Sequence, residues 1–186
     1  MTDSMRLAGS GMLALTRDTL ATLRQALFRD LGGDAAGYLQ EAGYAGGATL
    51  FEAFTRWAAD RGYGAPEAMA ASDFPRHATE FFGDLGWGSL ALGTLHDTVA
   101  TLDSADWGEA DPTAGMELPG CHVTTGMFVD FFGRLAGTPM AVMEVECRSM
   151  GAPRCRFLLG SAEALHHVYD EMSRGATYED AVASVA

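Results

Sequence analysis

Four side chains in the last third of the chain have the types and the spacing of a metal site. Cys121, Cys147 and Cys155 are the three cysteines of the 186-residue sequence, and Glu144 lies among them. Turn-forming glycine and proline residues separate the last two cysteines and apolar residues flank them, which predicts a hairpin with one cysteine on each arm. Sulfur ligands and a carboxylate oxygen can surround Zn²⁺ as a tetrahedron. The four residues therefore predict a zinc site.

Spacing alone leaves other interpretations open. The chain has no pair of CxxC motifs, and its cysteines can equally be small buried hydrophobic residues, or Cys147 and Cys155 can form a disulfide. A regular strand would point Glu144 and Cys147 to opposite faces, so a bulge or a strand end must bring them together. Glu146, which shares a strand face with Glu144, and His122 are the alternative ligands.

The elements that must position these residues follow the apolar pattern of the chain. Helices are predicted over 18–30, from 34 to beyond 57 (two helices or a bent one, because glycines interrupt the pattern) and over 73–83. Strands are predicted over 12–16, 87–94 and 98–107, followed by a connector over 111–120. A helix over 120–135, a hairpin over 140–149 and 154–160, and helices over 161–172 and from 177 complete the chain. The pattern predicts an α+β fold with helices packed on an antiparallel sheet.

The segment around the cysteines resembles the signature of the vinyl-4-reductase domain family. The matching residues are Cys121-His122-Val123-Thr124-Thr125-Gly126, Phe131-Phe132-Gly133, Glu144-Val145-Glu146-Cys147, Gly151 and Cys155-Arg156-Phe157. The family includes the sensor domains of phenol- and aromatic-responsive activators, in which three cysteines and a glutamate hold zinc, and a bacteriochlorophyll-synthesis vinyl reductase-like protein. By resemblance, Cys121, Glu144, Cys147 and Cys155 are the zinc ligands.

The resemblance also implies the fold and the domain organisation. The expected architecture is the nitric-oxide-signalling and Golgi-transport ligand-binding fold, with residues 1–186 as a single ligand-binding domain and 119–160 as its zinc hairpin segment. Related domains dimerise, so a homodimer is expected.

Composition excludes several classes of function. The net charge of −13 disfavours binding to nucleic acids and to anionic membranes. Every basic residue is arginine, so Schiff-base chemistry and a Walker-type phosphate loop are excluded. The sequence shows no signal peptide and no stretch long enough to span a membrane, and its few clustered cysteines fit a reducing compartment, so we expect a cytoplasmic protein.

A metal with four protein ligands has no position left for water, so the zinc is predicted to be structural and the function is assigned to the apolar interior. The candidate ligand-binding residues are aromatic or histidine side chains, and for each of them the alternative is an ordinary core position: His77, Phe81, Trp87, His96, Trp107 and Phe128.

The predicted function is that of a receptor or carrier for a small hydrophobic, aromatic or tetrapyrrole-like molecule, acting through a partner or simply carrying its ligand. The alternative is an enzyme or accessory protein in (bacterio)chlorophyll synthesis that acts on a vinyl-bearing tetrapyrrole. The sequence has no glycine-rich dinucleotide fingerprint after a predicted strand, which argues against direct reduction, and no catalytic residue is assigned. A tethering scaffold and a haem sensor centred on His77 are weaker alternatives.

Overall fold

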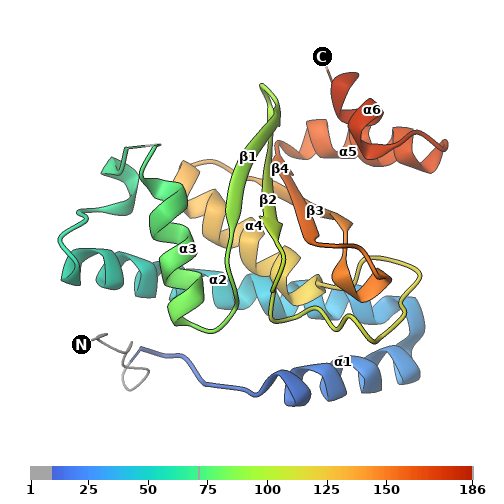
Figure 1. The fold of residues 1–186 in the computed structure, drawn as a ribbon, viewed down its shortest axis with the longest axis horizontal. Helices are drawn as coiled ribbons and strands as arrows, with labels where there is room; N and C mark the ends of the chain where they lie inside the picture. Colours follow the sequence, from blue (N-terminus) through green and yellow to red (C-terminus); the bar gives the residue numbers. More distant parts are fainter. Residues whose placement is uncertain (1–9, 71, 186) are drawn as a thin grey trace.

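The computed structural model describes residues 10–70 and 72–185 (Figure 1). Its helices are α1 (Arg17–Leu31), α2 (Ala35–Asp60), α3 (Phe74–Asp84), α4 (His122–Ala136), α5 (Ala162–Ser173) and α6 (Tyr178–Ala183), and its strands are β1 (Ala91–His96), β2 (Val99–Ser104), β3 (Ala141–Glu146) and β4 (Cys155–Gly160). The strands form an antiparallel sheet in the order β1-β2-β4-β3. The predicted α+β fold is confirmed. None of the described helices has the length and apolar character needed to cross a membrane.

The two faces of the sheet are covered by different helices (Figure 1). Strand alternation turns Phe157 of β4 toward the large core shared with α2, α3 and α4, and turns Leu158 toward a smaller core formed with α5 and α6. The large core is rich in aromatic side chains. Phe54, Phe81 and Phe131 are fully buried in it, and their ring centroids lie 5.1–6.4 Å apart. This part of the interior is therefore filled by the chain's own side chains.

Helices α2 and α4 pack closely because glycine stands at their contact. A Cβ atom on Gly126 of α4 would overlap the carbonyl oxygen of Gln40, and one on Gly43 of α2 would overlap that of Val123. The glycines of α2 were expected to interrupt the helix, but α2 is continuous over Ala35–Asp60. They let the neighbouring helix approach, and their backbone stays helical.

Two further local expectations were wrong. Residues 12–16 are extended but pair with no described strand, because they lie against helices and away from the sheet. Helix α1 begins one residue earlier than expected, and its cap is Thr16, whose side chain accepts a hydrogen bond from the backbone N–H of Thr19. The end of α4 is as expected: Gly137 terminates it in the left-handed conformation, with φ of 64°.

Candidate functional site

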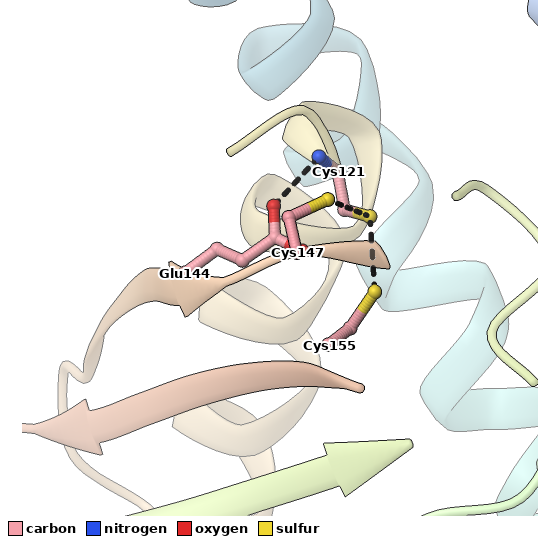
Figure 2. Close-up of side chains that lie close together, drawn as sticks. All are labelled: Cys121, Glu144, Cys147 and Cys155. Atoms are coloured by element: carbon pink, nitrogen blue, oxygen red, sulfur yellow. Dashed lines mark hydrogen bonds between the residues drawn. The ribbon is translucent and has the colours of Figure 1, made fainter. Parts of the chain in front are cut away.

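The four predicted ligand residues lie together at one end of the hairpin (Figure 2). Cys121 immediately precedes α4, Glu144 lies in β3, Cys147 follows β3, and Cys155 begins β4. One ligand atom from each residue lies within 4.8 Å of those of the other three. The chain thus gathers a cluster of three cysteines and a glutamate that is close enough to bind a metal ion.

A bulge in β3 explains how Glu144 and Cys147 reach the same side. Glu144 pairs with Phe157 of β4, whereas Glu146 pairs with Arg156, so two steps along β3 match one step along β4. The extra residue reverses the facing of the strand, and Glu146 turns away from the cysteines. Its carboxylate instead accepts hydrogen bonds from Arg154 and from the Tyr178 hydroxyl. Strand parity had left Glu144 and Glu146 equivalent, and the bulge separates them.

The geometry of the cluster fits a tetrahedral zinc ion. The sulfur of Cys121 lies 3.8 Å from that of Cys147 and 3.8 Å from that of Cys155. Two sulfurs bound to one zinc ion at about 2.3 Å in a tetrahedron are about 3.8 Å apart. A disulfide requires a bond of about 2.05 Å, and the three cysteines are free, so the predicted alternative of a Cys147–Cys155 disulfide is not formed.

Glu144 is the fourth member of the fit. Its Oε2 accepts a hydrogen bond of 2.8 Å from the backbone N–H of Cys121, while Oε1 is buried without any partner among the described residues. An unpartnered buried carboxylate oxygen is costly, and a metal ion would satisfy it. Ligation itself stays a prediction.

Crowding of acidic groups perturbs the titration of the cluster. Burial, followed by the nearby Cys147 thiolate, raises the pKa of Glu144 to about 8. Hydrogen bonding to Cys147 and Cys155, together with burial, raises the pKa of Cys121, whereas hydrogen bonds from Cys121 and Cys155 lower the pKa of Cys147. The cluster therefore concentrates more negative charge than the protein alone stabilises, and a divalent cation would relieve this repulsion.

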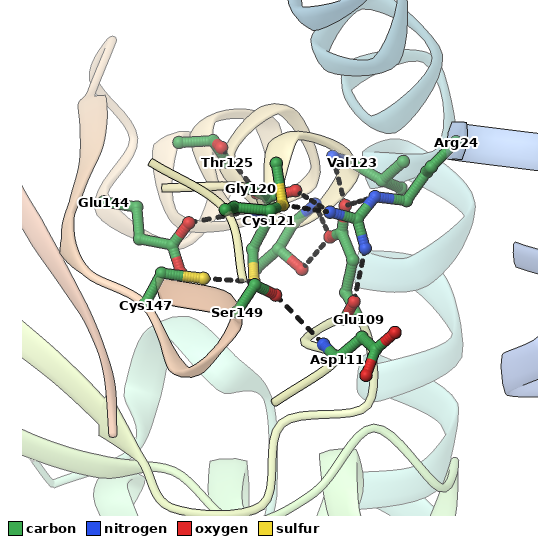
Figure 3. Close-up of polar contacts among 12 residues, drawn as sticks. Arg24, Glu109, Asp111, Gly120, Cys121, Val123, Thr125, Glu144, Cys147 and Ser149 are labelled. Atoms are coloured by element: carbon green, nitrogen blue, oxygen red, sulfur yellow. Dashed lines mark hydrogen bonds and ion pairs between the residues drawn. The ribbon is translucent and has the colours of Figure 1, made fainter. Parts of the chain in front are cut away.

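A buried polar network adjoins the cluster and was not foreseen from the sequence (Figure 3). Arg24 of α1 is 5% exposed and donates to the carbonyl oxygens of Glu109 and Gly120. The Glu109 carboxylate is buried, faces the Arg24 guanidinium, and accepts hydrogen bonds from the backbone N–H groups of Val123 and Thr124. Burial raises the pKa of Glu109, and the charge of Arg24 opposes that shift.

This network fixes the residue before Cys121 to a helix almost a hundred positions earlier in the chain. The one signal in the sequence is that Arg24 falls on the apolar face of its helix, between Leu20 and Leu27. That spacing indicates a buried charge and gives no sign of which carboxylate pairs with it.

An open apolar pocket of about 650 Å³ lies on the other side of the first turns of α4. The extended segment 11–16 and the start of α1 form one wall, small residues of α2 form another, and residues 85–87 and 108 close the remainder. Val123 and Met127 of α4 complete the lining. All lining residues are Gly11, Met12, Leu13, Ala14, Leu15, Thr16, Arg17, Leu20, Ala42, Gly43, Ala45, Gly46, Thr49, Leu50, Leu85, Gly86, Trp87, Gly108, Val123 and Met127.

Of the candidate ligand-binding residues, the structure places Trp87 on this pocket. Phe81, Trp107 and Phe128 are fully buried in the aromatic core, where the Trp107 indole N–H donates to Thr124 Oγ1 at 2.7 Å.

The two histidines lie elsewhere. His77 is buried and stacks on Tyr63 with ring centroids 3.8 Å apart, and its Nδ1 has no partner among the described residues. His96 ends β1 and contacts Thr98 at the tip of the β1–β2 hairpin. Sequence reasoning missed the main pocket wall, because segment 11–16 and the glycine and alanine face of α2 carry no polar signature.

The segment that carries the cluster also carries a family match. Residues 109–161 match the family model of the vinyl-4-reductase domain, which confirms the predicted resemblance to that family. A search of curated proteins gives no match.

Several solved structures share the fold. The phenol-responsive sensory domain of the transcription activator PoxR, solved with phenol, is similar with a TM-score of 0.63 and 18% identity, covering 87% of this chain and 82% of that one. A vinyl-4-reductase family protein from Methanocaldococcus jannaschii has a TM-score of 0.53 and 15% identity, covering 80% and 83%. A trafficking protein particle complex subunit 3 from Naegleria fowleri, covalently bound to palmitic acid, has a TM-score of 0.54 and 12% identity, covering 77% and 91%. The predicted fold is confirmed.

Proposed function

We propose that this chain is a single small-molecule-binding domain, braced by a structural zinc ion, that holds a hydrophobic ligand in the pocket between segment 11–16 and α2. The observation that carries the proposal is the position of α4. Cys121 of the cysteine cluster immediately precedes this helix, and Val123 and Met127 of its first turns line the pocket. A metal that fixes the start of α4 would also fix one wall of the pocket.

The size and the chemistry of the pocket support a small apolar ligand. Its volume of about 650 Å³ lies within the range of about 300–1,000 Å³ that is typical of small-molecule sites. Its lining is mostly aliphatic and glycine, with Trp87 as the aromatic member. Two of the solved structures with this fold are complexes with aromatic or apolar molecules, phenol in one and palmitic acid in the other.

The zinc part of the proposal is tested by a matched pair of variants in β3. We expect the purified protein to contain one zinc ion per chain by elemental analysis. Glu144→Gln should lose most of the metal and melt at a lower temperature, because a carboxylate ligand is replaced by a neutral amide. Glu146→Gln changes the same chemistry two residues away on the other side of the strand and should keep its zinc. Equal metal content in the two variants would contradict the assignment.

The ligand part is tested by filling the pocket. Gly46 lines the pocket, and a Cβ atom there would meet open space, as it would at Gly37 of the same helix outside the pocket. Gly46→Leu should abolish the binding of phenols, naphthalene or palmitate in calorimetry, because the new side chain occupies the ligand volume. Gly37→Leu should leave binding unchanged. If no compound of these classes binds the wild-type protein, the receptor proposal is wrong.

The alternative function and the association state stay predictions. Turnover of a vinyl-bearing tetrapyrrole with NAD(P)H would favour the enzyme in (bacterio)chlorophyll synthesis. For the homodimer, Leu23 and Leu31 of α1 offer apolar surface, being 51% and 43% exposed. Light scattering of the wild-type protein against Leu23→Ser would show whether α1 forms that interface.

A further inference from the structure

We propose that Arg17 binds the head group of the ligand and that this ligand is an amphipathic monocarboxylate. The inference rests on the proposed function and deepens it, since it assigns a chemical class to the occupant of the pocket. Arg17 opens α1 at the pocket wall formed with segment 11–16. The rest of the lining is neutral, so Arg17 supplies the charge of the site.

The guanidinium of Arg17 is free to accept an anion. Nine of the eleven described arginines form an ion pair with a carboxylate: Arg24, Arg29, Arg56, Arg61, Arg76, Arg134, Arg154, Arg156 and Arg174. Arg17 and Arg148 form none with the residues that the structure describes. In a chain with 25 acidic residues, an arginine without a carboxylate partner beside an apolar pocket is unusual.

Arg17 is also held in place. Its Nη2 donates to the carbonyl oxygen of Gly86 at 3.3 Å, and its Nε lies 3.4 Å from the position that a Cβ atom on Gly108 would take. Both Gly86 and Gly108 line the pocket. A guanidinium has five N–H donors, so one contact to Gly86 leaves most of the donor fork available. The side chain is therefore positioned across the pocket wall with unused donors.

A second donor on the same wall fits an acceptor-rich ligand. Trp87 lines the pocket, and its indole N–H donates no hydrogen bond to any of the described residues. Among the described residues, no acidic side chain and no histidine lines the pocket. The polar groups of the lining thus favour a ligand that accepts hydrogen bonds, and they offer no carboxylate to bind an amine.

One arginine favours a carboxylate over a phosphate. A phosphate monoester carries about −1.5 to −2 charges at neutral pH, and a single guanidinium would leave part of that charge uncompensated in a protein of net charge −13. A carboxylate carries one charge and matches the guanidinium fork. The apolar remainder of the molecule would occupy the aliphatic part of the pocket.

Four probes of one shape separate these classes: 4-butylbenzoate, 4-butylphenol, butylbenzene and 4-butylphenyl phosphate, each titrated calorimetrically against the full chain at neutral pH. We expect 4-butylbenzoate to bind about tenfold tighter than 4-butylphenol, because it gains a charge-assisted hydrogen bond. Arg17→Gln should remove that advantage and leave 4-butylphenol binding unchanged. Arg29→Gln, on the same helix outside the pocket, is the matched control and should behave as wild type.

The failures of the two proposals are distinguishable. If no probe binds the wild-type protein, the pocket proposal itself fails. If the probes bind and Arg17→Gln changes none of their affinities, or weakens the phenol and the benzoate equally, Arg17 has no head-group role and the inference alone is overturned. Tightest binding of the phosphate ester, lost in Arg17→Gln, would overturn the assignment to carboxylates.

Discussion

The cysteine cluster and the pocket share the first turns of α4 but are built in opposite ways. Around the cluster, cysteine sulfurs, Glu109 and Arg24 are buried and hydrogen-bonded to the backbone from several directions. Around the pocket, Leu13 and Leu15 are 89% and 65% exposed, and segment 11–16 pairs with no described strand. The difference indicates two separate roles: the closed end determines the shape of the domain, and the open end can admit a ligand at little cost to stability.

The largest expected effect is at the closed end. Glu109→Ala should reduce the free energy of unfolding by about 3–5 kcal/mol, because it leaves the Arg24 charge buried without its partner and removes the acceptor of two N–H groups at the start of α4. Urea denaturation measures this change. A loss below about 1 kcal/mol would show that water replaces the carboxylate and that the closed end is less rigid than its contacts suggest.

The next effect concerns the helix contact that joins the two regions. Gly126→Ala should destabilise the domain by about 1–3 kcal/mol, because the added methyl group overlaps the carbonyl oxygen of Gln40 and separates α4 from α2. Thermal unfolding of this variant is compared with Gly37→Ala, which meets open space on α2 and should stabilise by about 0.4–1 kcal/mol. Similar melting temperatures for the two variants would contradict the close approach.

A smaller effect is expected from acid on the side of the pocket. Asp106 accepts hydrogen bonds from the side chain and the backbone N–H of Ser89, which follows the pocket residue Trp87 by two positions, and these bonds lower the pKa of Asp106 below 3.8. Its contribution to stability is present above about pH 4, and it is lost as the pH falls through the lowered folded value. Asp106→Asn should therefore flatten the fall of melting temperature with acid. An unchanged pH profile would count against this contact.

The smallest effect is expected on the wall of the pocket. Leu13→Ser should change the free energy of unfolding by no more than about 0.5 kcal/mol, because the side chain is exposed in the folded protein. It should still weaken binding of an apolar ligand such as naphthalene, measured in the same calorimeter cell as the wild type. A large loss of stability would mean that segment 11–16 is an integral part of the core, which would remove the contrast between the two regions.

The local sequence determined most of the elements and the composition of the metal cluster. Caps and turn residues are short-range signals, so Ser161, Thr177 and Gly137 mark helix ends in both the sequence and the structure. The side chains suited to zinc are likewise evident from their types. Periodicity could not choose between Glu144 and Glu146, because a regular strand puts them on one face.

The tertiary structure decided the features that depend on distant parts of the chain. The β-bulge against β4 assigns Glu144 to the cysteines and Glu146 to Arg154. The pairing of Arg24 with Glu109 joins residues 85 positions apart, and the pocket forms where an extended segment crosses a helix face of small residues. Such contacts leave no periodic trace in the sequence, since each side chain is selected by a neighbour that only folding brings near. For this reason the chemistry of the cluster was predictable, and the location of the binding pocket was not.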